Sequence, residues 1–466
     1  MEKKLRVAYR ELRTDPQALD AVLTGHAHID LVWLWPERVG EAKAVHSFAT
    51  ADRLMDIYPE FLFAYSQTAS YAAVSRFSPA LHRRVLLRIG QKRWEATGAT
   101  EVESDTLLPC GEALARSFLI GQEAFAELRG GKPSRLLWLP DVFGYAGCLP
   151  QLMRQTGVEY FFTTKMTWGA VTKFPYSSFV WRGDDGSEVV AHIVSQNFGY
   201  NGKTSLGELK GHALGHRQSD AHHEFLAPTG YGDGGGGPTE EMCERARRVA
   251  NLASLPRVKW GGVEPFFDRL AKLRAKLPTY RGEWYLEYHR GVFTTVRSQQ
   301  PGRPQDEAMW EVPCSRWAAV SDEGEHDGLL VVTGSKYGFS ARDGTLGVSL
   351  LRTVPITGYD QKHAAAYAQS LLRERTPTPH LADLGRHEIA LALGRYDSWA
   401  KPLARGRWPL RLHETLGRRG AAQLRLAAGW TARRTDLLEK PGALLREGRV
   451  PFRPYEIVSV IVEAQR

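Results

Sequence analysis

The stretch GHAHIDLVWLW, residues 25–35, follows directly on the apolar run Ala21-Val22-Leu23. Alternate residues of a β-strand point to the same side, so His26, His28 and Asp30 share one face at the end of a buried strand. Two interpretations fit this pattern. One is a hydrogen-bonded cluster in the core. The other is the beginning of a metal site, because nitrogen and oxygen ligands suit Zn²⁺ or a similar divalent ion.

Composition narrows the class of protein to which this stretch belongs. The chain has 466 residues, 43% of them hydrophobic and 24% charged, which is typical of a soluble globular protein of two or three domains. No apolar run approaches the ~20 residues of a membrane span, and no apolar stretch follows the basic N-terminus as in a signal peptide. A cytoplasmic protein without a membrane partner is therefore predicted.

Charge and cysteine usage exclude two further classes. The net charge is +9, but the basic residues are scattered and form no run interleaved with aromatic residues, so a nucleic-acid partner is not expected. The four cysteines lie far apart without a CxxC pair. This spacing indicates free thiols rather than a disulfide framework or a thiolate metal site.

Short apolar runs alternate with helical patterns as far as about residue 295. Helical spacing of apolar residues marks residues 112–128 and 264–277. The alternation predicts an α/β domain with a parallel sheet wrapped by helices, either open or closed into a barrel. The strand-like runs lie at 22–24, 61–65, 136–139, 160–164, 189–194 and 225–227, with a weaker candidate at 257–260.

The pattern changes after about residue 300. Residues 298–307, SQQPGRPQDE, are polar and predict a linker or loop. Short alternating runs bounded by Gly and Asp follow, which favours an antiparallel β-sandwich. These runs lie at 328–333, 347–352, 387–393, 422–427 and 457–462.

Three more groups of polar residues follow strand-like runs of the first half, where the active sites of α/β proteins collect. They are Asp141 in WLPDVFGY, Lys165 in TTKMTW and Asp233 in TGYGDGGGGPT. Taken alone, Asp141 is better explained as a cap of the next helix. GYGDGG fits the pattern G-x-G-x-x-G, but Asp233 inside it would repel a pyrophosphate, so the loop is better explained as one that brings a carboxylate close to a ligand.

Taken together, these groups indicate glycoside hydrolysis. Two carboxylates on either side of a glycosidic bond are the usual machinery of that reaction. Aromatic residues near them in sequence can stack on sugar rings, although core packing is the better explanation for any single tryptophan among them. These aromatic residues are Trp33, Trp35, Phe143 and Trp168.

Long stretches, in order, resemble the bacterial branch of the family 38 glycoside hydrolases, the retaining α-mannosidases. The resemblance covers about residues 20–297 and extends to segments of the second half. The stretches are GHAHIDLVWLWPE, SFATADRLMDIYPEFLFAYSQ, VESDTLLPCGEAL, LWLPDVFGYAGCLPQLM, YFFTTKMTW, GYGDGGGGPT and GEWYLEYHRGVFTT, followed by VPCSRWAAVSD, SKYGFSARDGTLGVSLLR and FRPYEIVSV.

The resemblance implies a seven-stranded β/α barrel with one zinc ion, followed by a β-sandwich. It implies that His28, Asp30 and Asp141 bind the metal and that Asp141 is also the nucleophile, with Asp233 as acid/base. The two-step reaction would hydrolyse terminal α-mannosyl linkages through a glycosyl ester on Asp141. The substrate would be a mannose-containing oligosaccharide or glycoside, and zinc would contact its O2 and O3.

The resemblance also implies a set of substrate contacts. Trp33 would stack on the sugar, and Phe143 and Lys165 would line the pocket. Glu103 and Asp105, in VESD, would bind sugar hydroxyls. A homo-oligomer is a further expectation, since the family often forms dimers or tetramers.

The chain departs from the family pattern in two places. We expect no counterpart of the family's N-terminal β domain, and we expect the block between residues 291–295 and 310–317 to be missing. That block supplies a fourth zinc ligand, and His326, in an acidic loop, does not replace it. We therefore expect a barrel over 1–297, a linker over 298–310 and a truncated sandwich over 311–466. Two alternatives stay open: a catalytically impaired remnant that binds sugar or is vestigial, and a metal-dependent carbohydrate deacetylase.

Overall fold

The computed structural model describes residues 19–33, 35–107, 109, 111–168, 174–195, 199–285, 312–313, 317–321, 328–334, 336, 338–342, 345–350, 386–396, 407–414, 417–426 and 428–464. The chain divides into two compact units, one of residues 1–286 and 404–466 and one of residues 287–403. The predicted linker at 298–310 lies outside the described residues, so the domain boundary placed there stays a prediction. Among the described residues, no helix is both long and apolar enough to cross a membrane.

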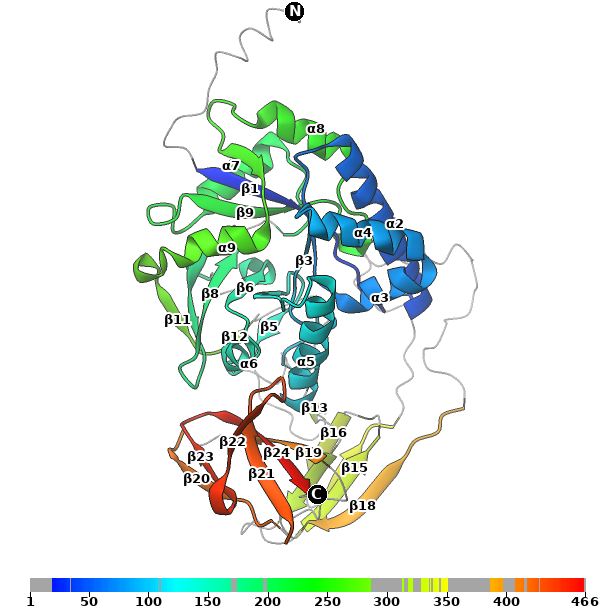
Figure 1. Cartoon of the computed structure of the whole chain (residues 1–466), viewed down its shortest axis with the longest axis vertical. Helices are drawn as coiled ribbons and strands as arrows, with labels where there is room; N and C mark the ends of the chain where they lie inside the picture. Colours follow the sequence, from blue (N-terminus) through cyan, green and yellow to red (C-terminus); the bar gives the residue numbers. More distant parts are fainter. Residues whose placement is uncertain are drawn as a thin grey trace, which may run out of the picture. The chain divides into compact units, whose positions relative to one another are not determined.

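Strand β1 (Asp20–Gly25) organises the first sheet of the larger unit. It lies beside β9 (Glu224–Thr229) in Figure 1 and pairs with that strand in parallel over its whole length. It also pairs in parallel with β10 (Arg257–Trp260) over its first four residues. Its last residue pairs with β2 (Phe63–Tyr65), which continues in parallel to β3 (Trp94–Ala96). The predicted parallel arrangement is confirmed here, and four of these five strands fall on predicted runs.

A second sheet has the order β11-β7-β8-β6-β4. Its pairs are parallel except for β7 and β8, which form an antiparallel hairpin. A parallel bridge between Gly98 and Leu137 joins the end of β3 to β4. No pairing among the described strands closes the two sheets into a ring, so the seven-stranded barrel is not confirmed. The strands are β4 (Leu136–Trp138), β6 (Tyr160–Thr163), β7 (Ser178–Arg182), β8 (Glu188–Ile193) and β11 (Thr279–Arg281).

Helices follow most strands of this unit. The predicted helix at 112–128 is confirmed, with one more residue at its start, whereas the one at 264–277 ends at residue 271 and is followed by a 3₁₀ turn, η3 (Arg274–Lys276). The helices are α2 (Glu37–Ile57), α3 (Thr68–Phe77), α4 (Pro79–Gly90), α5 (Gly111–Leu128), α6 (Leu149–Gln155), α7 (Leu206–Gly215), α8 (Glu240–Val249) and α9 (Val263–Ala271).

One apolar cluster draws on both sheets and on α9. Val22 of β1 lies in it together with Trp138 of β4 and Phe162 of β6, whose rings stack with centroids 4.1 Å apart. Alternation along β1 then places Thr24 and His26 on the same side as Val22, further toward the strand's end. Both are almost completely buried, so this face changes from apolar to polar where β1 ends.

Glu95 of β3 anchors the N-terminus of α9. Its carboxylate accepts the backbone N–H of Glu264 at 2.7 Å and that of Val263. Glu264 in turn holds Arg129 through two bonds of 2.7 and 2.8 Å. Burial, and then the charge of Glu264, raise the pKa of Glu95 to about 7 from an ordinary 4.5. A proton on Glu95 therefore stabilises the fold.

We expect Glu95→Gln to remove a pH-dependent component of stability. A carboxyl with a raised folded pKa stabilises the protein fully below its unfolded pKa of 4.5, and this contribution disappears as pH rises through about 7. The loss between pH 4.5 and 8 amounts to at most ~3 kcal/mol. Melting temperatures across this range should decline less steeply for the variant than for the wild type. Parallel curves would contradict the assignment, and exposed Glu123→Gln is the matched control.

The smaller unit consists of antiparallel strands, as predicted for the second half. One sheet has the order β14-β15-β18 and another the order β13-β16-β17. The strands are β13 (Val312–Pro313), β14 (Trp317–Ser321), β15 (Gly328–Thr333), β16 (Gly338–Arg342), β17 (Thr345–Val348) and β18 (Leu391–Tyr396).

Antiparallel strands near the C-terminus belong to the larger unit. Ile457 opens the strand β24 and contacts α6, because its N–H donates to Gln151 at 3.0 Å and its carbonyl accepts from Gln155 at 2.9 Å. The sheets have the orders β19-β24-β21-β22 and β20-β23. The strands are β19 (Arg407–His413), β20 (Gly420–Gln423), β21 (Trp430–Thr435), β22 (Pro441–Leu444), β23 (Arg449–Phe452) and β24 (Ile457–Ala464).

Candidate active site

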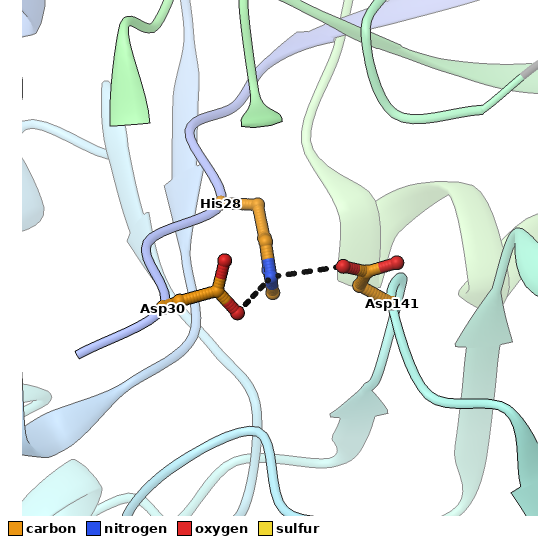
Figure 2. Close-up of side chains that lie close together, drawn as sticks. All are labelled: His28, Asp30 and Asp141. Carbon is orange, nitrogen blue, oxygen red and sulfur yellow. Dashed lines mark hydrogen bonds and ion pairs between the residues drawn. The ribbon is translucent and has the colours of Figure 1, made fainter. Parts of the chain in front are cut away.

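The structure brings His28, Asp30 and Asp141 together (Figure 2). One ligand atom from each lies within 4.8 Å of the other two. His28 and Asp30 follow the end of β1, and Asp141 follows β4 across the junction of the two sheets. The Nε2 atom of His28 lies 3.3 Å from Asp30 Oδ1 and 3.3 Å from Asp141 Oδ2.

This geometry fits a bound cation. A single Nε2–H can donate a good hydrogen bond to one acceptor, yet two carboxylate oxygens approach the atom at the same distance, which is long for a hydrogen bond. One imidazole nitrogen and two carboxylate oxygens form a donor set that suits zinc and similar divalent ions. The group is therefore able to bind a metal ion.

The other nitrogen of His28 contacts Glu103. The carboxylate Oε2 of Glu103 lies 2.8 Å from Nδ1, and both side chains are buried. Burial by itself lowers the pKa of His28, but the charge of Glu103 and hydrogen bonds to Asp141, Asp30 and Glu103 raise this pKa well above its ordinary value. The surroundings of the imidazole thus favour positive charge, and a metal ion at Nε2 would take the place of the proton.

His26 has a different environment although it lies only two residues away. It is completely buried, with its ring 5.1 Å from that of Trp138 and 6.2 Å from that of Tyr200. Burial, and then the charge of His28, lower the pKa of His26 to about 3, so it is neutral. Each interpretation of the opening motif therefore applies to one of its histidines. His26 belongs to the core, and His28 belongs to the metal-binding group.

Asp141 is held by a lysine as well as by His28. The Nζ atom of Lys165 lies 2.6 Å from Asp141 Oδ1, and the carbonyl of Pro140 accepts a 2.6 Å hydrogen bond from Thr164. Burial raises the pKa of Asp141, but His28 and Lys165 outweigh it and lower this pKa to about 2. The carboxylate is ionised at neutral pH. The interpretation of Asp141 as a helix cap is wrong, because Cys148 is the N-cap residue of α6.

Tyr200 is a site residue that no motif in the sequence predicted. It is buried, its ring lies 5.0 Å from that of His28, and Lys165 Nζ lies 5.3 Å from the ring centroid. Burial, then the charges of Asp141 and Asp233, raise the pKa of its phenol. Tyr200 thus lies within electrostatic reach of both predicted catalytic carboxylates. No periodicity or spacing marks it in the sequence.

Asp233 lies in the glycine loop and begins the 3₁₀ turn η2 (Asp233–Gly235). Its backbone N–H donates to Asn201 at 2.8 Å, and Lys43 of α2 donates to the carbonyl of Gly234 at 2.9 Å. Gly235 has a φ of +80°, and a Cβ there would lie 2.7 Å from Ile29, so glycine is required at this position. The loop therefore approaches the strand that carries the metal-binding group.

The electrostatic environment of Asp233 is opposite to that of Asp141. The residue is exposed, but the carboxyl loses part of its hydration in the loop, and this loss and the charge of Asp141 raise its pKa. The pKa values of the two carboxyl groups are therefore shifted in opposite directions, as the acid and the nucleophile of a retaining glycosidase require.

The remaining predicted residues lie in the surrounding loops. Trp33 is half-exposed and meets Trp35 edge-on at 5.3 Å, and the indole N–H of Trp35 donates to the carbonyl of Asp30 at 2.9 Å. The ring of Phe143 lies 5.3 Å from Lys165 Nζ. The carboxylate of Asp105 accepts the N–H of Leu107 at 2.6 Å. The side chain of Trp168 lies outside the described part of the chain.

Comparison with known proteins identifies the family. The N-terminal domain of glycosyl hydrolases family 38 matches residues 18–283, and the C-terminal domain of that family matches residues 256–356. The first match alone spans more than half of the chain, so the chain belongs to this family. The resemblance inferred from the motifs is confirmed.

Individual relatives agree with this assignment. Alpha-mannosidase G of Dictyostelium discoideum is 38% identical over 278 residues, which cover 60% of this chain and 25% of that protein. Alpha-mannosidase 2C1 of Homo sapiens is 39% identical over 287 residues, covering 61% and 27%. The chain thus spans about a quarter of the length of these relatives. A solved alpha-mannosidase structure from Enterococcus faecalis V583 matches with a TM-score of 0.48 and 17% identity, covering 57% of this chain and 31% of that one.

Proposed function

We propose that the chain is a zinc-dependent retaining α-mannosidase that hydrolyses terminal α-mannosyl linkages. The observation that carries the proposal is the pair of carboxylates with opposed pKa shifts. Asp141, beside Lys165 and His28, has a lowered pKa, and Asp233 on the glycine loop has a raised one. Family membership and the curated mannosidases 38–39% identical to the chain support mannose as the sugar.

In the proposed first step, Asp141 attacks the anomeric carbon. The bond from that carbon to the leaving oxygen breaks, and Asp233 donates its proton to this oxygen. In the second step, Asp233 removes a proton from water, which then hydrolyses the glycosyl ester on Asp141. His28, Asp30 and Asp141 would hold zinc. When bound, zinc supplies a Lewis acid that binds sugar hydroxyls. Trp33, Phe143, Lys165 and Asp105 are the proposed substrate contacts.

The test is turnover of an aryl α-mannoside by the purified full chain supplied with zinc. We expect release of the aryl alcohol, and α-mannose as the first anomer detected by NMR, because two displacements retain configuration. Mannose binding without turnover would support the catalytically impaired remnant instead. Release of acetate from acetylated sugars without aryl release would support the deacetylase, for which the Asp233 loop has no assigned task.

The loss of rate caused by Asp233→Asn should depend on the leaving group of the substrate. A phenolate that leaves easily needs little protonation, whereas an alcohol leaves only with a proton from the acid. We expect kcat/KM on a methyl or disaccharide mannoside to fall about 10²–10⁴-fold, and much less on a dinitrophenyl mannoside. The alkaline limb of the wild-type pH profile, where Asp233 loses its proton, should also disappear. Equal losses on both substrates would contradict the acid role.

A further inference from the structure

The contacts of Glu103 differ from those expected of a residue that binds a sugar hydroxyl. Its side chain is 3% exposed and that of His28 is 5% exposed. One carboxylate oxygen, Oε2, lies 2.8 Å from His28 Nδ1, and the other, Oε1, accepts the hydroxyl of Ser66. Both carboxylate oxygens of Glu103 therefore contact other protein side chains. Glu103 lies beside Nδ1 of His28, whereas Asp30 and Asp141 lie beside Nε2.

A second layer of hydrogen bonds fixes Glu103 relative to the metal-binding strand end. The backbone N–H of Glu103 donates to Gln67 Oε1 at 3.3 Å. The amide Nε2 of Gln67 donates to the carbonyl of Ile29 at 2.7 Å, and Ile29 is the residue between His28 and Asp30. Ser66 and Gln67 follow β2, so neighbouring strand ends hold the glutamate and the histidine in one network.

We propose that Glu103 is a positioning residue that holds His28 with its proton on Nδ1, so that the lone pair of Nε2 faces Asp30 and Asp141. This inference rests on the metal site of the proposed function. A carboxylate that accepts Nδ1–H fixes the tautomer and orientation of a metal-binding imidazole and strengthens Nε2 as a ligand. Glu103 does not touch the metal in this assignment and acts through His28.

The test is the zinc affinity of the full chain, measured by competition with a chromophoric chelator. In Glu103→Gln, Ser66 can still donate to the amide oxygen, and the amide NH₂ then faces His28. It donates to Nδ1 and drives the proton to Nε2, the ligand atom. We expect zinc to bind about 10–100-fold more weakly, the usual effect of losing an outer partner of a metal ligand. Ser66→Ala should weaken binding in the same direction but less.

Two controls distinguish a positioning role of Glu103 from an effect on the stability of the fold and from an effect of net charge. Glu123→Gln changes an exposed residue of α5 by the same charge and should leave zinc affinity unchanged. A purely structural Glu103 would lower the melting temperature of the zinc-free chain and leave affinity as in the wild type. That result overturns the proposal. Should Glu103→Gln not fold, Ser66→Ala decides, and unchanged affinity in that variant also overturns it.

The readout also distinguishes this inference from the proposed function. Zinc affinity is measured without substrate. A wild-type chain that binds zinc but does not cleave mannosides would therefore refute the α-mannosidase, and the effect of Glu103→Gln on zinc affinity would still test the positioning role. A wild-type chain that binds no zinc refutes both the metal site and the positioning role.

Discussion

We expect replacement of Asp141 by alanine to lower kcat on an aryl α-mannoside by at least about 10⁴-fold, the scale on which loss of a nucleophile acts. The carboxylate is ionised, since His28 and Lys165 lower its pKa to about 2 despite burial. Without it the proposed glycosyl ester cannot form, and Lys165 and His28 lose the carboxylate that both of them contact. The measurement is the rate of aryl release under saturating substrate, for the variant and the wild type side by side.

Two further measurements make this expectation specific. Azide should restore aryl release to Asp141→Ala by entering the space of the missing carboxylate and should form the β-mannosyl azide, the product of a single displacement. Asp184→Asn, an exposed aspartate in the turn between β7 and β8, is the matched control and should retain wild-type turnover. Near-normal turnover by Asp141→Ala would refute Asp141 as the nucleophile.

Removal of the metal should have a comparably large effect. We expect dialysis against a chelator to abolish turnover and added zinc to restore it. Zinc should also raise the melting temperature, because an ion that binds only the folded state stabilises it by about 2.7 kcal/mol at 100 times its Kd. Activity that survives complete chelation would contradict a metal-dependent reaction.

His28→Ala should abolish both zinc binding and turnover. The variant loses the only nitrogen ligand of the group and leaves the carboxylates of Asp30, Asp141 and Glu103 without the positive charge between them. The loss of affinity should exceed the 10–100-fold typical of an outer partner. His46→Ala, at an exposed position of α2, is the matched control. Full zinc content in His28→Ala, measured by atomic emission, would rule out the site.

Local patterns in the sequence predicted most of the strands and helices near the site. The apolar run before His26 forms β1, and the helical spacing at 112–128 forms α5. β3, by contrast, was not predicted. It has three residues with the charged Glu95 at its centre, so it contains no apolar run, and its alternation is too short to mark a strand.

The sequence by itself determined the family, the α/β alternation and the residue types that can bind a metal, because these depend on short-range periodicity and on ordered motifs. Only the tertiary structure decided which side chains contact one another at the site. Glu103 and His28 lie 75 residues apart, and Tyr200 comes from a segment without a recognisable motif. Contacts of this kind depend on how loops after different strands converge, and that convergence is set by sheet pairing and core packing rather than by the residues next to each side chain.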